Sequence, residues 1–535
     1  MLNTAVKSPC DEAAIRHGKT ATPCAASAKR WVLVAAIIGS SMAFIDGTVV
    51  NVALPAIQRD LHADVFEAQW VVEAYALFLA SLLLVGGSLG DRYGRRRMFM
   101  IGTALFGLAS VGCAASSDVR QLIAARAAQG IGAALLVPGS LALISASFPE
   151  GERGRAIGTW SGFSGITAAV GPVLGGYLVD RFSWAWAFLI NVPFALGVLV
   201  IAWSRVPESR NPNAPPALDV SGALLATLGL SGVVFAFIEA PTHGWAAPRV
   251  LLAMGIGLAA LAGFVVNEWR SAAPMLPLAF FRNRDFAGTN LLTLWLYAAL
   301  GGGLFFLPLN LIQVQGYSAT AAGAALLPFI FIMFALSRWS GRLVDKRGPR
   351  KPLVMGPLVA AVGFAAFALP ATGGSYWVTF LPAIIVLGFG MAVTVAPLTT
   401  TVMNAAGPEA AGTASGVNNA VSRVAAVLAV AIFGSVMAWA FERALAGALH
   451  SARLPDDLVT LVLAQRSRLA AIELPGGIDA ASVATIERCV ADAFVSGFRW
   501  VMGISAALAL ASSLAAMILI SARANPAATV SKPAR

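Results

Sequence analysis

Ionisable side chains inside long apolar stretches are the part of this sequence that could do chemistry. Asp46, Glu73, Arg126 and Arg338 each lie within a stretch of mostly apolar residues. A charged group in hydrocarbon is costly, so such a residue marks a functional site or has a partner. Burial favours the protonated form of a carboxyl group, whereas a nearby arginine favours the ionised form. An acid placed beside an arginine could therefore bind and release a proton without covalent chemistry.

We expect Asp46, Glu73 and Arg126 to form a proton-exchange cluster, because their positions in the chain predict similar depths in one helical bundle. The alternative for Asp46 and Arg126 is a structural ion pair that only holds two helices together. Glu73 is interpreted as a coupling carboxylate or a carboxylate that binds substrate. Arg338 is expected to extend its side chain to the membrane interface.

The elements that must position these groups are membrane-spanning helices. The chain has 535 residues, of which 58% are hydrophobic and 12% charged, far less charge than a soluble domain carries. About 20 apolar residues in a helix cross the hydrocarbon core. We predict an all-α fold of about 14 spans, at 31–55, 70–90, 98–115, 121–148, 156–179, 186–204, 219–239, 249–268, 288–311, 321–341, 353–370, 377–399, 417–440 and 498–521.

Lysine and arginine are distributed unevenly between the predicted loops. With the N-terminus inside, the short outside loops contain only Arg59, Arg120, Arg181 and Arg249. Basic residues gather on the cytoplasmic side of membrane proteins, so we expect both ends of the chain to be cytoplasmic. The same rule accounts for the net charge of +11 without a nucleic-acid partner. The first 30 residues do not resemble a signal peptide, so residue 31 is expected to begin a retained span.

Two loops of the sequence repeat one pattern. Gly87-Ser-Leu-Gly-Asp91-Arg-Tyr-Gly94-Arg-Arg-Arg97 matches Gly341-Arg-Leu-Val-Asp345-Lys-Arg-Gly348-Pro-Arg-Lys351 at a constant offset of 254 positions. Glycine permits a tight turn between two helix ends, and the arginines could anchor the turn at an anionic membrane surface. Simple anchoring explains the arginines but not the spaced glycines and aspartate. Internal repeats of this kind are typical of secondary transporters.

Several motifs now support a family resemblance. Gly87–Arg97 resembles the signature loop of the major facilitator superfamily, and Ile45–Pro55 resembles the first-span motif of its 14-span drug:proton antiporters, the EmrB/QacA type. Leu122–Gly132 resembles the arginine motif of the fourth span. Gly162 with Gly171–Gly176 resembles the antiporter motif of the fifth, and Ala411–Gly416 the segment that enters span 13.

The resemblance implies a division of the chain into two six-helix bundles. We expect a cytoplasmic tail at 1–30, the first bundle at 31–204, an inserted helix pair at 219–268, the second bundle at 288–521 and a cytoplasmic tail at 522–535. A long extracytoplasmic loop is expected at 441–497, where Val483, Ile486, Val490 and Phe494 line one face of a helix. That helix is interpreted as a lid or partner contact, or as a loosely packed surface helix.

The resemblance also assigns candidate site residues to each part of the fold. The gating loops would comprise Gly87, Gly90, Asp91, Arg92, Gly94, Arg95, Asp345 and Gly348. The antiporter helix would use Gly162, Gly171, Pro172, Gly175 and Gly176 as a pivot between the bundles, although ordinary close packing also explains such small residues. A central substrate cavity could be lined by Phe44, Trp295, Tyr297, Phe305, Phe306 and Met391, because aromatic faces stack on planar compounds and attract cations.

The implied function is proton-coupled efflux of drugs or toxic compounds by alternating access, without a cofactor. A dedicated exporter of one metabolite or antibiotic and a membrane-embedded sensor or enzyme are the alternatives. No phosphate loop, nucleophile motif or metal-site spacing is evident, and the four histidines lie outside the predicted spans. The partners would be amphipathic substrates, protons and lipid in a bacterial inner membrane. For an EmrB-like protein they would include a periplasmic adaptor and an outer-membrane channel.

Overall fold

The computed structural model describes residues 26–210, 219–271, 274–406, 411–452, 454–475 and 478–522. The described residues form helices and connecting turns, and no strand occurs among them. Cys10, Cys24 and most of the two predicted tails lie outside the described residues, as do some side chains within α6 and α13. The all-α expectation is confirmed by the helical content and by the relatives reported below.

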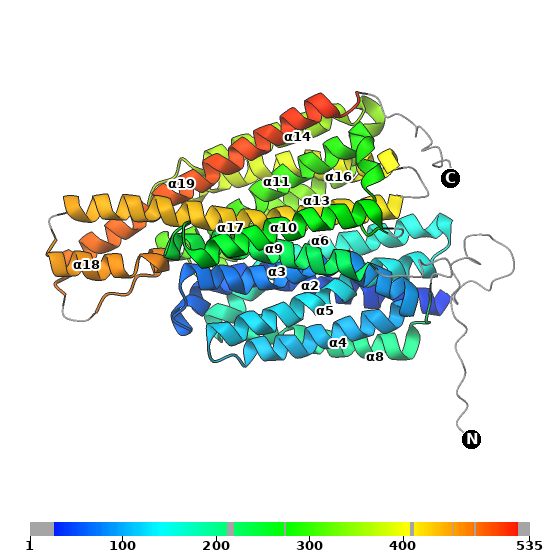
Figure 1. Cartoon of the computed structure of the whole chain (residues 1–535), viewed down its shortest axis with the longest axis horizontal. Coiled ribbons are helices and arrows are strands. Elements are labelled where there is room, and N and C mark those ends of the chain that lie inside the picture. Colours follow the sequence, from blue (N-terminus) through cyan, green and yellow to red (C-terminus); the bar gives the residue numbers. More distant parts are fainter. Residues whose placement is uncertain are drawn as a thin grey trace, which may run out of the picture. The chain divides into compact units, whose positions relative to one another are not determined.

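Each predicted span coincides with helical residues, and several helices extend beyond the predicted ends; Figure 1 shows their arrangement. The first group is α2 (Ala26–Asp60), α3 (Val65–Tyr93), α4 (Arg95–Ala114), α5 (Val119–Ser147), α6 (Glu150–Arg181), α7 (Trp186–Leu189) and α8 (Asn191–Arg205). Then come α9 (Val220–His243), α10 (Pro248–Arg270), η1 (Leu278–Arg282), α11 (Arg284–Leu309) and η2 (Asn310–Val314). The last group is α12 (Ala319–Ala325), α13 (Leu327–Arg347), α14 (Arg350–Phe367), α15 (Tyr376–Thr379), α16 (Leu381–Ala406), α17 (Ala411–Ser451), α18 (Asp456–Ala464), η3 (Arg466–Ala471) and α19 (Ala480–Leu519).

Thirteen helical segments of the described residues are long and apolar enough to cross a membrane. The remaining predicted span, 156–179, coincides with α6, a 32-residue helix in which several side chains are not described. Proline lies inside α2, α5, α6, α9, α11, α14 and α16. Spanning helices tolerate these prolines because neighbouring groups satisfy the freed backbone carbonyls.

The chain divides into two compact units. Unit 1 comprises 1–53, 74–228 and 261–275, and unit 2 comprises 54–73, 229–260 and 276–535. The boundary therefore passes through α2, α3, α9 and α10. Unit 2 includes the C-terminal end of α2 and the N-terminal end of α3, together with the whole C-terminal half of the chain.

Large apolar side chains are exposed along the outer faces of many helices. Leu108 on α4, Trp203 on α8, Phe331 on α13 and Val362 on α14 are all more than half exposed. Such faces are stable in lipid, and the apolar composition of the helices agrees with this environment. The described chain is therefore a multi-pass membrane protein.

Two helices of unit 2 are longer than a helix needs to be to cross a bilayer. Helix α17 has 41 residues and α19 has 40, so each is about 60 Å long, roughly twice the hydrocarbon thickness. The C-terminal end of α17, α18, η3 and the N-terminal end of α19 contact one another and form a protrusion, which we call the stalk (Figure 1). Its core contains Phe441, Leu445, Leu449, Val462, Ile486, Val490 and Phe494, all buried.

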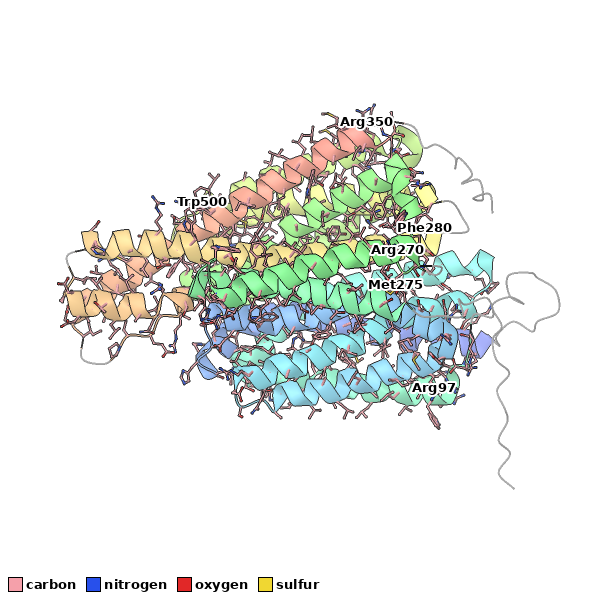
Figure 2. All side chains as sticks on the ribbon, viewed as in Figure 1. Arg97, Arg270, Met275, Phe280, Arg350 and Trp500 are labelled. Carbon is pink, nitrogen blue, oxygen red and sulfur yellow. The ribbon has the colours of Figure 1, made fainter. Side chains whose placement is uncertain are left out.

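The stalk corrects the expectation for residues 441–497. The segment is largely helical, and the predicted helix at 482–494 is the beginning of α19 rather than a separate element. A loosely packed surface helix is the wrong interpretation, because Ile486 and Phe494 are at most 1% exposed. At the base of the stalk Trp439 and Trp500 pack edge to face with ring centroids 5.8 Å apart, and both rings are half exposed. Within unit 2, Arg350 and Phe280 lie near one end and Trp500 lies closer to the other, toward the stalk (Figure 2).

Candidate functional site

The acid and the arginine predicted to meet form an ion pair in the interior of unit 1. Nη1 of Arg126 on α5 donates to Oδ2 of Asp46 on α2 at 2.5 Å. Asp46 is fully buried and Arg126 is 1% exposed. A buried ion pair gains Coulomb attraction at close range, but both ions lose their hydration. Each charge is therefore stable in the interior only while the other is present.

Two further side chains donate to the Asp46 carboxylate, and Ser110 contacts both of them. Nε2 of Gln129 donates to Oδ1 at 2.8 Å, and Nδ2 of Asn191 donates to the same oxygen at 3.1 Å. The hydroxyl of Ser110 accepts from both amides, at 3.0 Å and 3.4 Å. All these residues are fully buried. The carboxylate oxygens thus accept three hydrogen bonds, two from side chains of α5 and one from the first residue of α8.

The guanidinium group of Arg126 has contacts on its other sides as well. Nη1 also donates to Oε1 of Gln129 at 2.7 Å. The guanidinium carbon lies 4.3 Å from the ring centroid of Tyr75 and 5.7 Å from that of Phe188. The Tyr75 hydroxyl donates to the carbonyl oxygen of Ala43 at 3.4 Å. Cation–π attraction therefore partly replaces the lost hydration of the arginine.

Glu73 differs from Asp46 in its surroundings. It is 1% exposed, yet neither carboxyl oxygen has a hydrogen-bond partner in the part of the chain that the structure describes. It belongs to unit 2, whereas Asp46 and Arg126 belong to unit 1. The structure brings together two of the three expected cluster residues and leaves Glu73 out of their hydrogen-bond network.

Sequence analysis missed Ser110, Asn191 and Tyr75, and it did not assign a role to Gln129. Gln129 follows Arg126 by three residues, so both side chains lie on one face of α5. Asn191 lies within the predicted span 186–204, and Ser110 is one small polar residue in an apolar span. The available signal was a polar residue inside a predicted span. The sequence does not show which of these residues lie at the same depth in the membrane and point toward one another.

The antiporter helix packs directly on the turns of α2 that carry Asp46. A Cβ atom at Gly171 would overlap Oγ1 of Thr48 and approach the backbone of Ile45 at 3.5 Å. A Cβ atom at Gly175 would lie 2.6 Å from Cγ1 of Val49. Pro172 and Gly176 are also buried, whereas the packing of Gly162 lies outside the described side chains. Glycine is required at 171 and 175 because no larger residue fits between α6 and α2.

Each of the repeated loops contains a glycine with positive φ directly after a helix. Gly94 follows α3 with φ 116°, and Gly348 follows α13 with φ 72°. The N–H group of Gly94 donates to the carbonyl oxygen of Gly90 at 3.0 Å, and that of Gly348 donates to Val344 at 2.9 Å. Each positive φ favours glycine, as the sequence predicts for a tight turn between helix ends. The Asp345 side chain lies outside the described part of the chain.

The first loop contains an ion pair and a cap. Arg95 donates through Nε to Oδ1 of Asp91 at 2.8 Å, while Arg92 is exposed. The carboxylate of Glu208 accepts from the backbone N–H groups of Arg96 at 2.9 Å and Arg97 at 3.1 Å. Glu208 thus satisfies donors at the N-terminus of α4, which Gly94 cannot cap with a side chain.

Replacing Glu208 by alanine is expected to lower the stability of unit 1 by about 1–2 kcal/mol, because two helix N–H groups lose their acceptor. The melting temperature of the purified protein in detergent measures this loss. Glu152→Ala is the matched control, since that carboxylate is 58% exposed in its ion pair with Lys29, and exposed pairs contribute little. An equal melting temperature for Glu208→Ala and Glu152→Ala would contradict the capping role.

The aromatic and methionine candidates divide by burial. Phe305, Phe306 and Met391 are at most 2% exposed, and the two phenylalanine rings pack edge to face with centroids 4.9 Å apart. Phe44, Trp295 and Tyr297 are partly buried. Burial alone does not test whether these side chains contact a substrate, so their role in substrate binding stays a prediction.

Other site chemistries find no support among the described residues. No group of three or more His, Cys, Asp and Glu side chains there could hold a metal ion. Cys113 and Cys489 are free thiols. The described part of the molecule thus combines many spanning helices, a repeated turn motif and one buried charge cluster. This combination defines the class of secondary transporters.

The chain belongs to the Major Facilitator Superfamily, whose family profile matches residues 36–430. It is a transporter rather than an enzyme. It is 33% identical to the tetracenomycin C resistance and export protein of Streptomyces glaucescens, with 92% of each chain covered. It is 36% identical to the multidrug resistance protein Stp of Mycobacterium tuberculosis, over 81% of this chain and 80% of that one. It is 37% identical to the puromycin resistance protein of Streptomyces alboniger, over 76% and 81%.

Solved structures agree on the fold. A bacterial homologue of the human lysosomal transporter Spinster, in an inward-facing and unoccupied conformation, aligns with a TM-score of 0.64. It shares 18% identity, over 94% of this chain and all of that one. A D-xylose–proton symporter aligns with a TM-score of 0.57 and 14% identity, over 93% and 99%. At these identities the likeness establishes the architecture alone.

Proposed function

We propose that this protein exports antibiotics or other toxic amphipathic compounds in exchange for protons, by alternating access. The observation that carries the proposal is the fully buried Asp46–Arg126 pair in a chain related to antibiotic and multidrug resistance proteins. The location proposed is a bacterial inner membrane, with both termini cytoplasmic, as the distribution of lysine and arginine favours. A periplasmic adaptor and an outer-membrane channel are proposed only for an envelope with two membranes.

The proton is exchanged at the Asp46 carboxylate. Ionised Asp46 is stabilised by Arg126, Gln129 and Asn191. A proton bound to the carboxylate removes its negative charge and leaves Arg126 without a full counter-charge in a dry interior. Such a loss costs about 3–5 kcal/mol when one partner of a buried pair is removed. That free energy favours a rearrangement of unit 1, which is the event that couples proton binding to a change in access.

Substrate and proton then compete through charge. A cationic or polar compound near the cluster favours ionised Asp46, and protonation favours release of the compound. Gly171 and Gly175 would let α6 move against α2 beside the acid, and the gating loops would limit the range of that movement. Phe44, Trp295, Tyr297, Phe305, Phe306 and Met391 are the proposed contacts for the apolar parts of the substrate.

The proposal is tested by expressing the chain in an efflux-deficient host and measuring susceptibility to a panel of unrelated antibiotics, with and without a protonophore. A multidrug exporter raises resistance to several unrelated compounds, and the protonophore removes this resistance. A dedicated exporter, which the relatives named for single antibiotics favour, raises resistance to one structural class. No protection against any compound, with the protein present in the membrane, would overturn the proposed function.

A further inference from the structure

Two polar side chains lie one turn apart on α3 within unit 2 and are not explained by the Asp46 cluster. Gln69 is fully buried and Glu73 is 1% exposed. Nε2 of Gln69 donates to the carbonyl oxygen of Val430 on α17 at 3.4 Å. Oε1 of Gln69 and both carboxyl oxygens of Glu73 have no hydrogen-bond partner among the described residues. One face of α3 thus presents three acceptor atoms without a donor.

A buried acceptor without a donor is unusual and costly. More than nine in ten buried polar groups find a partner, and Asp46 in the same protein accepts three hydrogen bonds. A buried carboxyl group without an arginine or lysine partner is neutralised by a bound proton or by another positive charge. A cation that carries N–H groups would neutralise Glu73 and also donate to the neighbouring Gln69 oxygen.

The spacing of the Gln69 and Glu73 acceptor atoms limits the size of a cation that could contact both side chains. Residues four apart on a helix have Cβ atoms about 6 Å from each other, so one ammonium group could reach both side chains. Helix α17 covers the position closely, because a Cβ atom at Gly434 would overlap the Gln69 side chain. The Gln69 amide therefore fills the space beside Gly434.

We propose that Gln69 and Glu73 form a recognition site for the protonated amine of an organic substrate. This inference rests on the proposed export function and names the substrate class that the charge at Glu73 selects. Asp46 and Glu73 then have different tasks. The first carboxylate exchanges protons beside its arginine, and the second neutralises the charge of the substrate.

The export test compares two compounds that differ only in charge, daunorubicin and its neutral N-acetyl derivative, in cells that express wild-type or Glu73→Gln protein. The substitution is expected to reduce amine export by about tenfold or more while export of the neutral compound is retained. Glu239→Gln is the matched control, because that carboxylate already lies 3.7 Å from the Arg249 guanidinium. Equal loss of both compounds, or no loss, would overturn the inference.

A second test does not depend on transport and therefore separates this inference from the proposed function. The purified protein is treated with dicyclohexylcarbodiimide, which modifies buried carboxyl groups, and the modified residue is identified by mass spectrometry. Dodecylammonium is expected to reduce modification of Glu73 several-fold, whereas dodecanol is not. Equal protection by both compounds, or no modification of Glu73 at all, would overturn the site even in a protein that exports drugs.

Substitution of Gly434 tests the covering helix. Gly434→Ala is expected to displace the Gln69 amide and to change the protection of Glu73 by dodecylammonium, because the added methyl group occupies the position of that amide. Gly447→Ala on the same helix is the control, since a Cβ atom there meets nothing within 4 Å. Identical protection in the two variants would contradict the proposed role of Gln69.

Discussion

Asp46→Asn is expected to abolish proton-driven export. Asparagine keeps the shape of the side chain but cannot ionise, so Arg126 loses the charge that it contacts at 2.5 Å. Removal of one partner of a buried ion pair costs about 3–5 kcal/mol, so the variant should also melt at a lower temperature. The measurement is the initial rate of substrate uptake into proteoliposomes that is driven by an imposed pH gradient, expressed per folded molecule.

A control and a double variant separate coupling from simple support. Asp118→Asn should have no effect, because Asp118 caps the N-terminus of α5 through Arg120 and Gln121 N–H groups and asparagine caps equally well. Asp46→Asn with Arg126→Gln removes both charges and should recover part of the lost stability. Gradient-driven export by that double variant at the wild-type rate would show that the pair only holds α2 and α5 together.

Gly171→Val is expected to eliminate export and to lower the melting temperature strongly. The new side chain would overlap Thr48 and press on the backbone of Ile45, which are neighbours of Asp46 on α2. Overpacking of a filled interior costs about 1–3 kcal/mol or more, and here the displaced helix carries the proton site. Export rate and melting temperature of the purified variant measure the two effects.

Gly158 provides the comparison on the same helix. A Cβ atom at Gly158 meets nothing within 4 Å, so Gly158→Val should retain export, with only the small cost of a β-branched residue in a helix. A smaller substitution can also be rescued, since Gly171→Ala with Thr48→Ala removes the nearest colliding atom. If Gly171→Val and Gly158→Val exported at equal rates, close contact between α6 and α2 would not be required.

Much of the helical arrangement follows from the sequence, because hydropathy and turn residues act locally. The ends of α3 and α13 at Gly94 and Gly348 agree with the repeated loop. Features that depend on contacts between distant parts of the chain could not be predicted from the sequence. A hydropathy window detects the apolar part of α17 and α19 but not the polar residues through which both helices continue. The π-helical turn η2 after α11 gives no signal of its own in the sequence.

The candidate site shows the same limit. Charge inside an apolar stretch identifies Asp46 and Arg126, and their complementary signs predict that they pair. Asn191 and Ser110 carry no charge. Asn191 joins the cluster because the start of α8 places it against Asp46, and Ser110 joins it because α4 places it against the Gln129 and Asn191 amides. Glu73 has the same charge as Asp46 but a different neighbourhood, and the spacing of the two acids in the chain does not distinguish them.

The stalk of unit 2 has a practical consequence for imaging. Most small membrane proteins are hidden within a detergent micelle, which leaves electron microscopy few landmarks for orienting single particles. A bundle of α17, α18 and α19 with its own apolar core would emerge from the micelle and provide such a landmark. Antibody fragments raised against this bundle could add mass for alignment.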